Sequence, residues 1–194
     1  MRLTRTQAGF TLSELLLTLA CAATITGMAV PVLSHALDDF RTGMAARYLA
    51  SRIRNARMDA IKRATAVALK LEPGTPDYAM IPYSDGNGNG VRTADILRGV
   101  DLPLGTTEQL GANFPGVHFG LAEGARDVDG AVSGTEGVRI GSARILTMSP
   151  DGTATAGTLY VRGRRAQYAV RVLGTTGRTR VLEYRARDRT WMPR

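Results

Sequence analysis

The sequence predicts an α+β fold in which a long N-terminal helix packs on an antiparallel β-sheet. Three observations support this prediction. An uncharged apolar run extends from Leu15 to Leu33, and a helical spacing of apolar residues continues after it. Short apolar segments separated by turn signals fill the rest of the chain. Glycine is frequent, with 22 residues among 194, which suits strands joined by turns better than a bundle of helices.

The N-terminal segment has a basic leader in front of the apolar run. Arg2 and Arg5 lie in this leader, and its first nine residues contain no acid. The run is long enough to cross roughly 30 Å of hydrocarbon, and preceding basic residues favour a cytoplasmic N-terminus with the bulk of the chain outside. A secretory signal peptide is the rival interpretation. Its small-residue cleavage site would follow the run, whereas Ala8 and Gly9 precede it.

Two residues are unusual for a membrane helix. Glu14 stands at the head of the run, where an ionised carboxylate costs about 2.5–3.5 kcal/mol to insert and therefore favours a cationic partner. Pro31 removes one helical hydrogen bond and crowds the carbonyl of Gly27, itself a poor helix former. Gly27 and Pro31 together predict a weak point where the helix can reorient. The alternatives are a snorkelling side chain for Glu14 and a simple kink at the membrane boundary for Pro31.

The stretch "GFTLSELL" resembles the prepilin signal of type IV pilins and type II secretion pseudopilins. The resemblance implies that residues 1–9 are a leader, that a prepilin peptidase cuts after Gly9, and that the amine of Phe10 is then methylated. Residues 10–33 would be the transmembrane and assembly helix. Glu14 would pair with the N-terminal amine of a neighbouring subunit in the growing filament. Pro31 matches the helix-weakening proline of the family.

The helix is predicted to continue over residues 34–66 as an amphipathic segment. Its apolar stripe steps by three or four residues through Leu33, Leu37, Phe40, Met44, Tyr48, Leu49, Ile53, Ala56, Ala60 and Ala64. Arginines lie mostly off this stripe and are interpreted as a solvated face: Arg41, Arg47, Arg52, Arg54 and Arg63. We expect the helix to end near residues 64–66.

Residues 67–194 are predicted to form one antiparallel β domain in the periplasm. "AVALKLEP" is interpreted as the first strand. Further strand candidates are residues 78–83, 96–100, 116–121, 138–148, 158–161, 168–173 and 179–184. Stretches such as "PGTP", "SPDG", "RGRR" and "GTTG" mark the turns, and residues 124–137 are interpreted as a polar loop.

The later part of the chain narrows the resemblance. "SRIRNARMDAIKRATAVAL", "DGNGNG", "RILTMSPDGTATAGTLYV" and "YAVRVLGTTGRTRV" together look like the pseudopilin H family, which includes FimT-type minor pilins. The resemblance implies a non-enzymatic subunit near the tip of a type II secretion pseudopilus or a type IV pilus. Its partners would be other pilins or pseudopilins. It would be held in the bacterial inner membrane before assembly.

The stretch "SDGNGNGVRTADI" resembles a calcium loop. Asp85, Asn87 and Asn89 follow the one-three-five spacing of calcium ligands. An EF-hand loop needs a bidentate Glu at its twelfth position, where Ile96 stands, and Asp95 lies one residue early. We therefore expect a Gly/Asn-rich hairpin turn and no cofactor, calcium included.

The C-terminal segment is strongly basic. Ten arginines and only two acids lie between Tyr160 and Arg194, so this segment alone accounts for the formal net charge of +8. Such a surplus attracts polyanions or anionic surfaces. The candidate DNA-binding residues are Arg162, Arg164, Arg165, Gly177, Arg178, Arg180, Arg185 and Arg187.

The sharpest part of this basic segment is "GRTR". Arg178 and Arg180 should project to the same face of an extended segment, and Tyr184 and Trp191 interleave with nearby arginines, as where bases stack on aromatic rings. "GRTR" resembles the Gly-Arg-x-Arg element with which FimT-type pilins of natural transformation contact DNA. The alternatives are a strand end that pairs with acidic neighbours, or arginine codon bias. Two functions therefore stay open: a structural subunit for secretion or pili, and a DNA-binding minor pilin.

Overall fold

The computed structural model describes residues 9–131 and 134–194, apart from the side chains of residues 28 and 30–32. Arg2 and Arg5 of the predicted leader lie outside the described residues. The chain divides into two compact units, Met1–Leu37 and Asp38–Arg194. The helices are α1 (Leu12–Arg63), α2 (Thr93–Leu97) and α3 (Leu110–Asn113). The strands are β1 (Val67–Glu72), β2 (Ala79–Ser84), β3 (Leu102–Pro103), β4 (Glu108–Gln109), β5 (His118–Phe119), β6 (Val138–Arg139), β7 (Ile145–Met148), β8 (Gly157–Arg162), β9 (Gln167–Leu173), β10 (Arg178–Arg185) and β11 (Thr190–Pro193).

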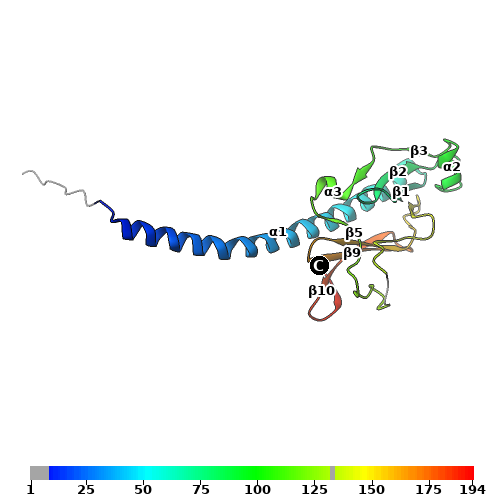
Figure 1. Cartoon of the computed structure of the whole chain (residues 1–194). Helices are drawn as coiled ribbons and strands as arrows, with labels where there is room; N and C mark the ends of the chain where they lie inside the picture. Colours follow the sequence, from blue (N-terminus) through cyan, green and yellow to red (C-terminus); the bar gives the residue numbers. More distant parts are fainter. Residues whose placement is uncertain (1–8, 132–133) are drawn as a thin grey trace, which may run out of the picture. The chain divides into compact units, whose positions relative to one another are not determined.

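The strands form two antiparallel sheets in the second unit (Figure 1). The first sheet has the order β3-β2-β1-β7, with β4 also paired to β2. The second sheet has the order β11-β10-β9-β8-β5, with β6 also paired to β8. The predicted α+β class with a helix on antiparallel strands is therefore confirmed, with two sheets in place of one.

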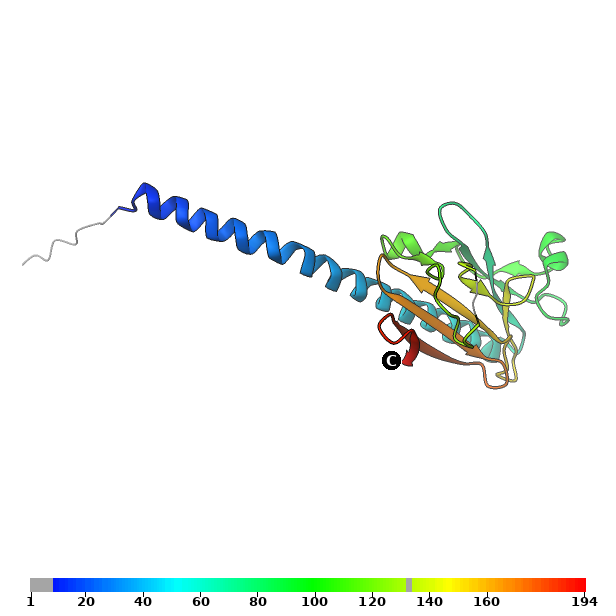
Figure 2. The same cartoon turned by 60° about the horizontal axis from the view of Figure 1, so that its bottom comes forward.

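The second part of α1 packs into the core between these sheets. Ala45, Leu49, Ile53 and Ala60 are each fully buried and share one apolar cluster with residues from both sheets, Leu146 among them. In Figure 2 this cyan part of α1 runs alongside the orange strands of the second sheet. Alanines on the buried face bring the helix backbone close to the strands, while leucine and isoleucine supply the buried apolar area.

The predicted apolar stripe is only half right. Its members from Leu49 to Ala60 are buried, but Ala64 is exposed, and Leu37, Phe40 and Met44 are 41%, 65% and 38% exposed. The buried face begins instead with Thr42, Ala45 and Ala46. Spacing alone could not separate the two sets, because both recur with the same helical period.

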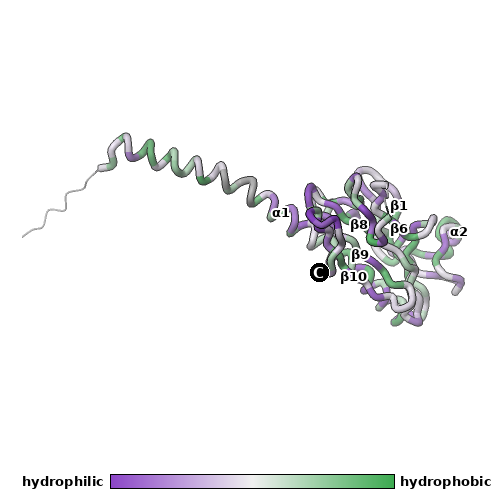
Figure 3. Tube along the Cα trace, turned by 90° about the horizontal axis from the view of Figure 1, so that it is seen from below, coloured by the Kyte–Doolittle hydropathy of each residue, from purple (hydrophilic) through white to green (hydrophobic). Residues whose placement is uncertain are grey.

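The first unit exposes its apolar side chains. Leu12, Leu17 and Ile25 are 77%, 65% and 69% exposed, and Figure 3 shows such hydrophobic residues in green at intervals along the first part of α1. Within the described residues, no helix combines the length and the apolar character of a membrane span.

The strand predictions differ from the structure at two main places. Residues 96–100 were expected to be a strand, but Ile96 lies in α2, and Gly99 has a φ of 69° in the turn that follows. Residues 138–148 were expected to be one strand, yet they form β6 in the second sheet and β7 in the first. Positive φ angles at Gly141 and Arg144 turn the chain between them. The predicted strands at residues 78–83, 158–161, 168–173 and 179–184 are confirmed as β2, β8, β9 and β10.

Candidate assembly segment and arginine surfaces

A capping box opens α1. Glu14 Oε2 accepts hydrogen bonds from the backbone N–H and the hydroxyl of Thr11, both at 2.9 Å, and the Glu14 N–H donates to Thr11 Oγ1 at 3.3 Å. The two side chains thereby satisfy backbone donors that the first helical turn leaves unpaired. The sequence carries this signal as Thr-Leu-Ser-Glu, a capping-box pattern that is not among the features predicted above. The Glu14 carboxylate therefore has a partner in its own chain before any other subunit supplies one.

The predicted cleavage site lies in exposed chain immediately before this cap. Gly9 and Phe10 precede the first residue of α1, and Phe10 is 84% exposed. Helix is assigned through Gly27 and Pro31 without interruption. The side chain of Pro31 lies outside the described residues. A continuous helix does not show how stable each turn is, so the weak point at Gly27 and Pro31 stays a prediction.

The topology of the second sheet divides the predicted arginine set. Because β8, β9, β10 and β11 are successive antiparallel neighbours, the turns between them alternate between two ends of the sheet. In Figure 2 the red β10–β11 turn and the dark-orange β9–β10 turn are at opposite ends. One end holds Arg162, Arg164, Arg165, Arg185 and Arg187, and the other holds Gly177, Arg178 and Arg180. The eight residues therefore do not form one surface.

The first group is tied to α1 by Asp38, and we name it the Asp38 end. The Asp38 carboxylate accepts backbone N–H groups from Arg164 at 2.9 Å, Arg165 at 2.9 Å and Ala166 at 3.2 Å. Partial burial acts to raise the pKa of Asp38, but these hydrogen bonds outweigh it and hold the pKa below its ordinary value. The turn also presses on the helix, since a Cβ at Gly163 would lie 2.2 Å from Thr42 Oγ1.

The second group lies against a later part of α1, and we name it the Arg57 end. Arg57 Nε donates to the carbonyl of Gly152 at 3.1 Å. Gly177 has a φ of 58°, and a Cβ there would lie 2.5 Å from the same carbonyl. Nineteen residues of helix separate Asp38 from Arg57, which corresponds to roughly 28 Å at about 1.5 Å per residue. The two ends of the sheet are therefore held well apart.

Arg178 and Arg180 project from one face of β10. Both are exposed, while Thr179 between them is half-buried, so the predicted shared face is confirmed. Neither guanidinium forms an ion pair or side-chain hydrogen bond within the part of the chain that the structure describes. Arg180 lies opposite Arg171 across the ladder, and Arg171 is neutralised by Asp129 at 2.7 Å.

The aromatic residues that flank the arginines of the β10–β11 turn pack on one another. The rings of Tyr184 and Trp191 lie 5.0 Å apart, and those of Tyr160 and Trp191 lie 5.5 Å apart. Trp191 Nε1 also donates to the carbonyl of Arg126 at 3.0 Å. These contacts occupy part of each ring and leave both side chains half-buried, and whether Tyr184 and Trp191 stack on bases stays a prediction.

The Gly/Asn-rich loop is closed by carboxylates that accept backbone N–H groups. Asp85 accepts from Asn87 at 3.0 Å, Gly88 at 2.8 Å and Gly90 at 2.7 Å. Burial acts to raise the pKa of Asp85, but these bonds dominate and lower it. The loop leads into α2, so it is not the simple hairpin turn that we expected.

The remaining calcium candidates already have partners inside the loop. Asp95 accepts hydrogen bonds from Asn89 Nδ2 at 3.2 Å and from Arg98 Nη2 at 2.8 Å. In the described ranges, no cluster of three metal-ligating side chains is found. Whether the loop binds calcium stays a prediction.

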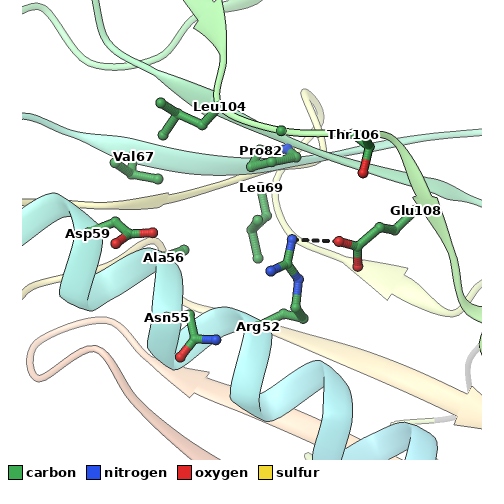
Figure 4. A pocket seen from close by; sticks show the side chains of 11 residues that line it. Arg52, Asn55, Ala56, Asp59, Val67, Leu69, Pro82, Leu104, Thr106 and Glu108 are labelled. Atoms are coloured by element: carbon green, nitrogen blue, oxygen red, sulfur yellow. Dashed lines mark ion pairs between the residues drawn. The ribbon is translucent and has the colours of Figure 1, made fainter.

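A cleft of about 280 Å³ lies between α1 and the first sheet (Figure 4). Arg52 Nη2 and Glu108 Oε1 are 2.7 Å apart across it, and the Tyr48 hydroxyl donates to Glu108 at 2.6 Å. Arg52 was expected on the solvated face of the helix, but it instead ties α1 to the sheet. Its Nε is buried and has no hydrogen-bond partner among the described residues.

Comparisons with known proteins complete the description of the site. The family described as type II transport protein GspH matches residues 45–177. The pilin-like protein PilA1 of Thermus thermophilus is 33% identical over 124 residues, which cover 62% of this chain and 65% of that protein. The match therefore spans slightly less than two thirds of this relative's length. No solved structure matches the chain.

Proposed function

From the premise that the chain belongs to the type II transport protein GspH family, we propose that it is a minor pseudopilin or minor pilin that enters a filament through the first part of α1. Such a protein is a structural subunit, not an enzyme. Its partners are other pilins or pseudopilins, and the filament is a type II secretion pseudopilus or the tip of a type IV pilus. The similarity to a pilin-like protein supports the same class.

The observation that carries the proposal is the contrast in burial along α1. Leu15, Leu16 and Leu19 are 57%, 56% and 62% exposed in the first unit, whereas Leu49 and Ile53 are fully buried in the second. A contiguous exposed apolar segment marks an interaction surface. Neighbouring helices cover it in the filament, and the inner membrane covers it before assembly.

The membrane stage of this proposal follows from the sequence of the first unit. No side chain between Leu15 and Leu33 is acidic or basic, which supports a single-pass segment. Arg2 and Arg5 before the run favour a cytoplasmic N-terminus and a periplasmic β domain. Prepilin peptidase cuts the exposed Gly9–Phe10 bond, and the new Phe10 amine is methylated.

Glu14 then changes partner on assembly. In the single chain its carboxylate closes the capping box with Thr11. The Phe10 ammonium of a neighbouring subunit offers a full positive charge instead, and the attraction between two opposite charges is much stronger away from water. Glu14 is thereby both a helix cap in the free subunit and a docking group in the filament.

Two substitutions separate these roles of Glu14. Glu14→Gln keeps an oxygen for the capping box but removes the charge, and Glu14→Ala removes both. In cells that make the filament, we expect both variants to be cleaved and retained in membranes, and both to fall about tenfold or more in the sheared filament fraction. Normal incorporation of Glu14→Gln would reject the charge-pairing role, and normal incorporation of Glu14→Ala would reject docking altogether.

The second candidate function is DNA binding through the Arg57 end. The observation that favours it is that Arg178 and Arg180 are exposed, share a face and have no side-chain partner within the described residues. Arginine forks bind phosphates well. Each phosphate contact adds about 0.9 to the slope of log affinity against log salt on duplex DNA.

A salt titration of the full chain in detergent tests this function. With double-stranded DNA, we expect Arg178→Gln/Arg180→Gln to lower the magnitude of the salt slope by roughly 1.8. The matched variant Arg164→Gln/Arg187→Gln removes the same charge from the Asp38 end and should leave the slope unchanged. An absence of binding near 50 mM salt, or equal losses in the two variants, would reject DNA binding through this end.

A further inference from the structure

The Asp38 end is tethered close to the uncharged segment of α1. Asp38 follows Leu33, the last residue of the uncharged run, by five residues. Five residues reach at most about 18 Å when fully extended and about 7.5 Å as helix. Three backbone N–H groups of the β8–β9 turn bind the Asp38 carboxylate. This turn therefore stays near the end of the uncharged run through bonded and hydrogen-bonded connections alone.

A second basic turn lies at the same end of the sheet. The β10–β11 turn is on the same side as the β8–β9 turn because two antiparallel strands, β9 and β10, separate them. Arg185, Arg187 and Arg189 in or beside it are all exposed, and Asp188 is its one acid. The two turns lie roughly 10 Å apart, at about 4.8 Å per strand.

The charge at this end points outward. The Asp38 carboxylate accepts backbone N–H groups of the β8–β9 turn, and the nearby positive charge of Arg164 also acts to lower its pKa. Arg164 is exposed and forms no side-chain hydrogen bond or ion pair within the described part of the chain, and the same holds for Arg187. The surface that these residues make is therefore positive and available to an anionic partner.

We propose that the Asp38 end binds the anionic headgroups of the phospholipid membrane that holds the first part of α1. This rests on the proposed function, because it requires the uncharged run to lie in the bilayer. The negative potential of an anionic leaflet falls off within a Debye length of about 8–10 Å. Asp38 follows the run by five residues, which is about 7.5 Å as helix and comparable to this range, whereas Arg57 lies roughly 28 Å farther along α1.

The proposal gives the two arginine groups different partners. Lipid headgroups bind the Asp38 end and fix the β domain against the membrane before assembly, since each arginine near an anionic surface strengthens binding about fivefold. Extraction into a filament breaks these contacts. The Arg57 end, which lies against a later part of α1, stays open to other polyanions.

A vesicle competition experiment with the full chain tests the proposal. The protein in detergent is diluted into equal amounts of phosphatidylcholine vesicles and of vesicles with about 30% phosphatidylglycerol, which are then separated by flotation. We expect the wild type to favour the anionic vesicles at least tenfold at 50 mM salt and to lose most of this preference at 500 mM. Arg164→Gln/Arg187→Gln should reduce the preference about 10- to 25-fold, which abolishes most or all of it.

The control is Arg178→Gln/Arg180→Gln, which removes the same charge from the Arg57 end and should keep the preference of the wild type. Equal partition of the wild type between the two kinds of vesicle would overturn the lipid proposal but leave the membrane segment intact. Equal losses in the two double variants would also overturn it, because net charge and not position would then decide. Failure to float with either kind of vesicle would overturn the proposed membrane segment, and the lipid proposal with it.

Discussion

The β8–β9 and β9–β10 turns of the second sheet look alike in sequence but are built differently. Both contain glycine beside exposed arginines, and both press against α1. At the Asp38 end a carboxylate accepts three backbone N–H groups of the turn. At the Arg57 end a guanidinium binds a carbonyl of an adjacent turn, and Gly177 fills a space with no room for a side chain. The β8–β9 turn is thus held by a charged carboxylate that binds its backbone, whereas the β9–β10 turn is held by close packing around Gly177.

Alanine at the two glycines should expose this difference most strongly. Gly177→Ala places a Cβ on a residue with φ of 58° and 2.5 Å from a backbone carbonyl. Strain in the left-handed region and overpacking together should lower the free energy of unfolding by roughly 2–4 kcal/mol. Gly163→Ala has no positive φ, so overpacking alone should lower it by about 1–3 kcal/mol.

Denaturant unfolding of the full chain in detergent measures both losses. At Gly163 the nearest obstacle is the Thr42 hydroxyl, at 2.2 Å. Thr42→Ala should therefore recover part of the loss in the Gly163→Ala background and none of the loss in Gly177→Ala. A larger loss at Gly163 than at Gly177 would contradict the distinction between the two turns.

Asp38→Asn should destabilise the charge-held turn specifically. The asparagine offers one oxygen, and its NH₂ group faces N–H donors, so we expect a loss of about 1–3 kcal/mol at neutral pH. Because the pKa of Asp38 is lowered in the folded state, its stabilisation is present above the ordinary aspartate pKa and is lost as pH falls through the folded value. The difference between wild type and variant should therefore shrink in acid.

The neighbouring aspartate provides the control. Asp39 accepts one hydrogen bond, from the Tyr168 hydroxyl at 3.1 Å, so Asp39→Asn should have a smaller effect. Unfolding free energies measured from neutral pH down to about pH 3 check both variants. A loss for Asp38→Asn that does not change with pH would show that its charge is not what holds the turn.

Local patterns in the sequence predicted elements well, but long-range contacts lay beyond their reach. The strands at residues 168–173 and 179–184 were predicted because alternation and the "GTTG" turn are local signals. The contact of Asp38 with the β8–β9 turn spans more than 120 residues and leaves no local pattern. The same limit explains why seven arginines and Gly177 were grouped as one set of DNA-binding candidates: strand order, which sequence spacing does not give, decides which turns share an end.

Some features that were not predicted had a recognisable signal in the sequence. The capping box of Thr11 and Glu14 is readable as Ser/Thr-x-x-Glu before an apolar run. Arg52, by contrast, could not be told from the solvated arginines, because its partner Glu108 lies on a strand of only two residues. The two-residue strands have too few residues for alternation to be detected.

The smallest expected effect concerns Arg171, whose charge is already neutralised by Asp129. Arg171 lies opposite Arg180 and pairs with Asp129 at 2.7 Å, where Asp129 is largely exposed. An exposed pair is worth about 0–1 kcal/mol, so Asp129→Asn should leave stability nearly unchanged. It should strengthen DNA binding by roughly two- to threefold in the same salt titration. Weaker binding in this variant would argue that Arg180 and Arg171 are not part of one surface.

The central claim is that the second sheet holds its arginines in two separate groups, and spin-label distances test it most directly. Cysteines replace Arg164, Arg178 and Arg187 in pairs, in a full chain where Cys21 is changed to serine so that only the introduced residues are labelled. The topology predicts that positions 164 and 187 lie roughly 10–15 Å apart and that positions 164 and 178 lie on the order of 25 Å apart. Equal distances for the two pairs, or a shorter one between 164 and 178, would contradict the division on which both binding proposals rest.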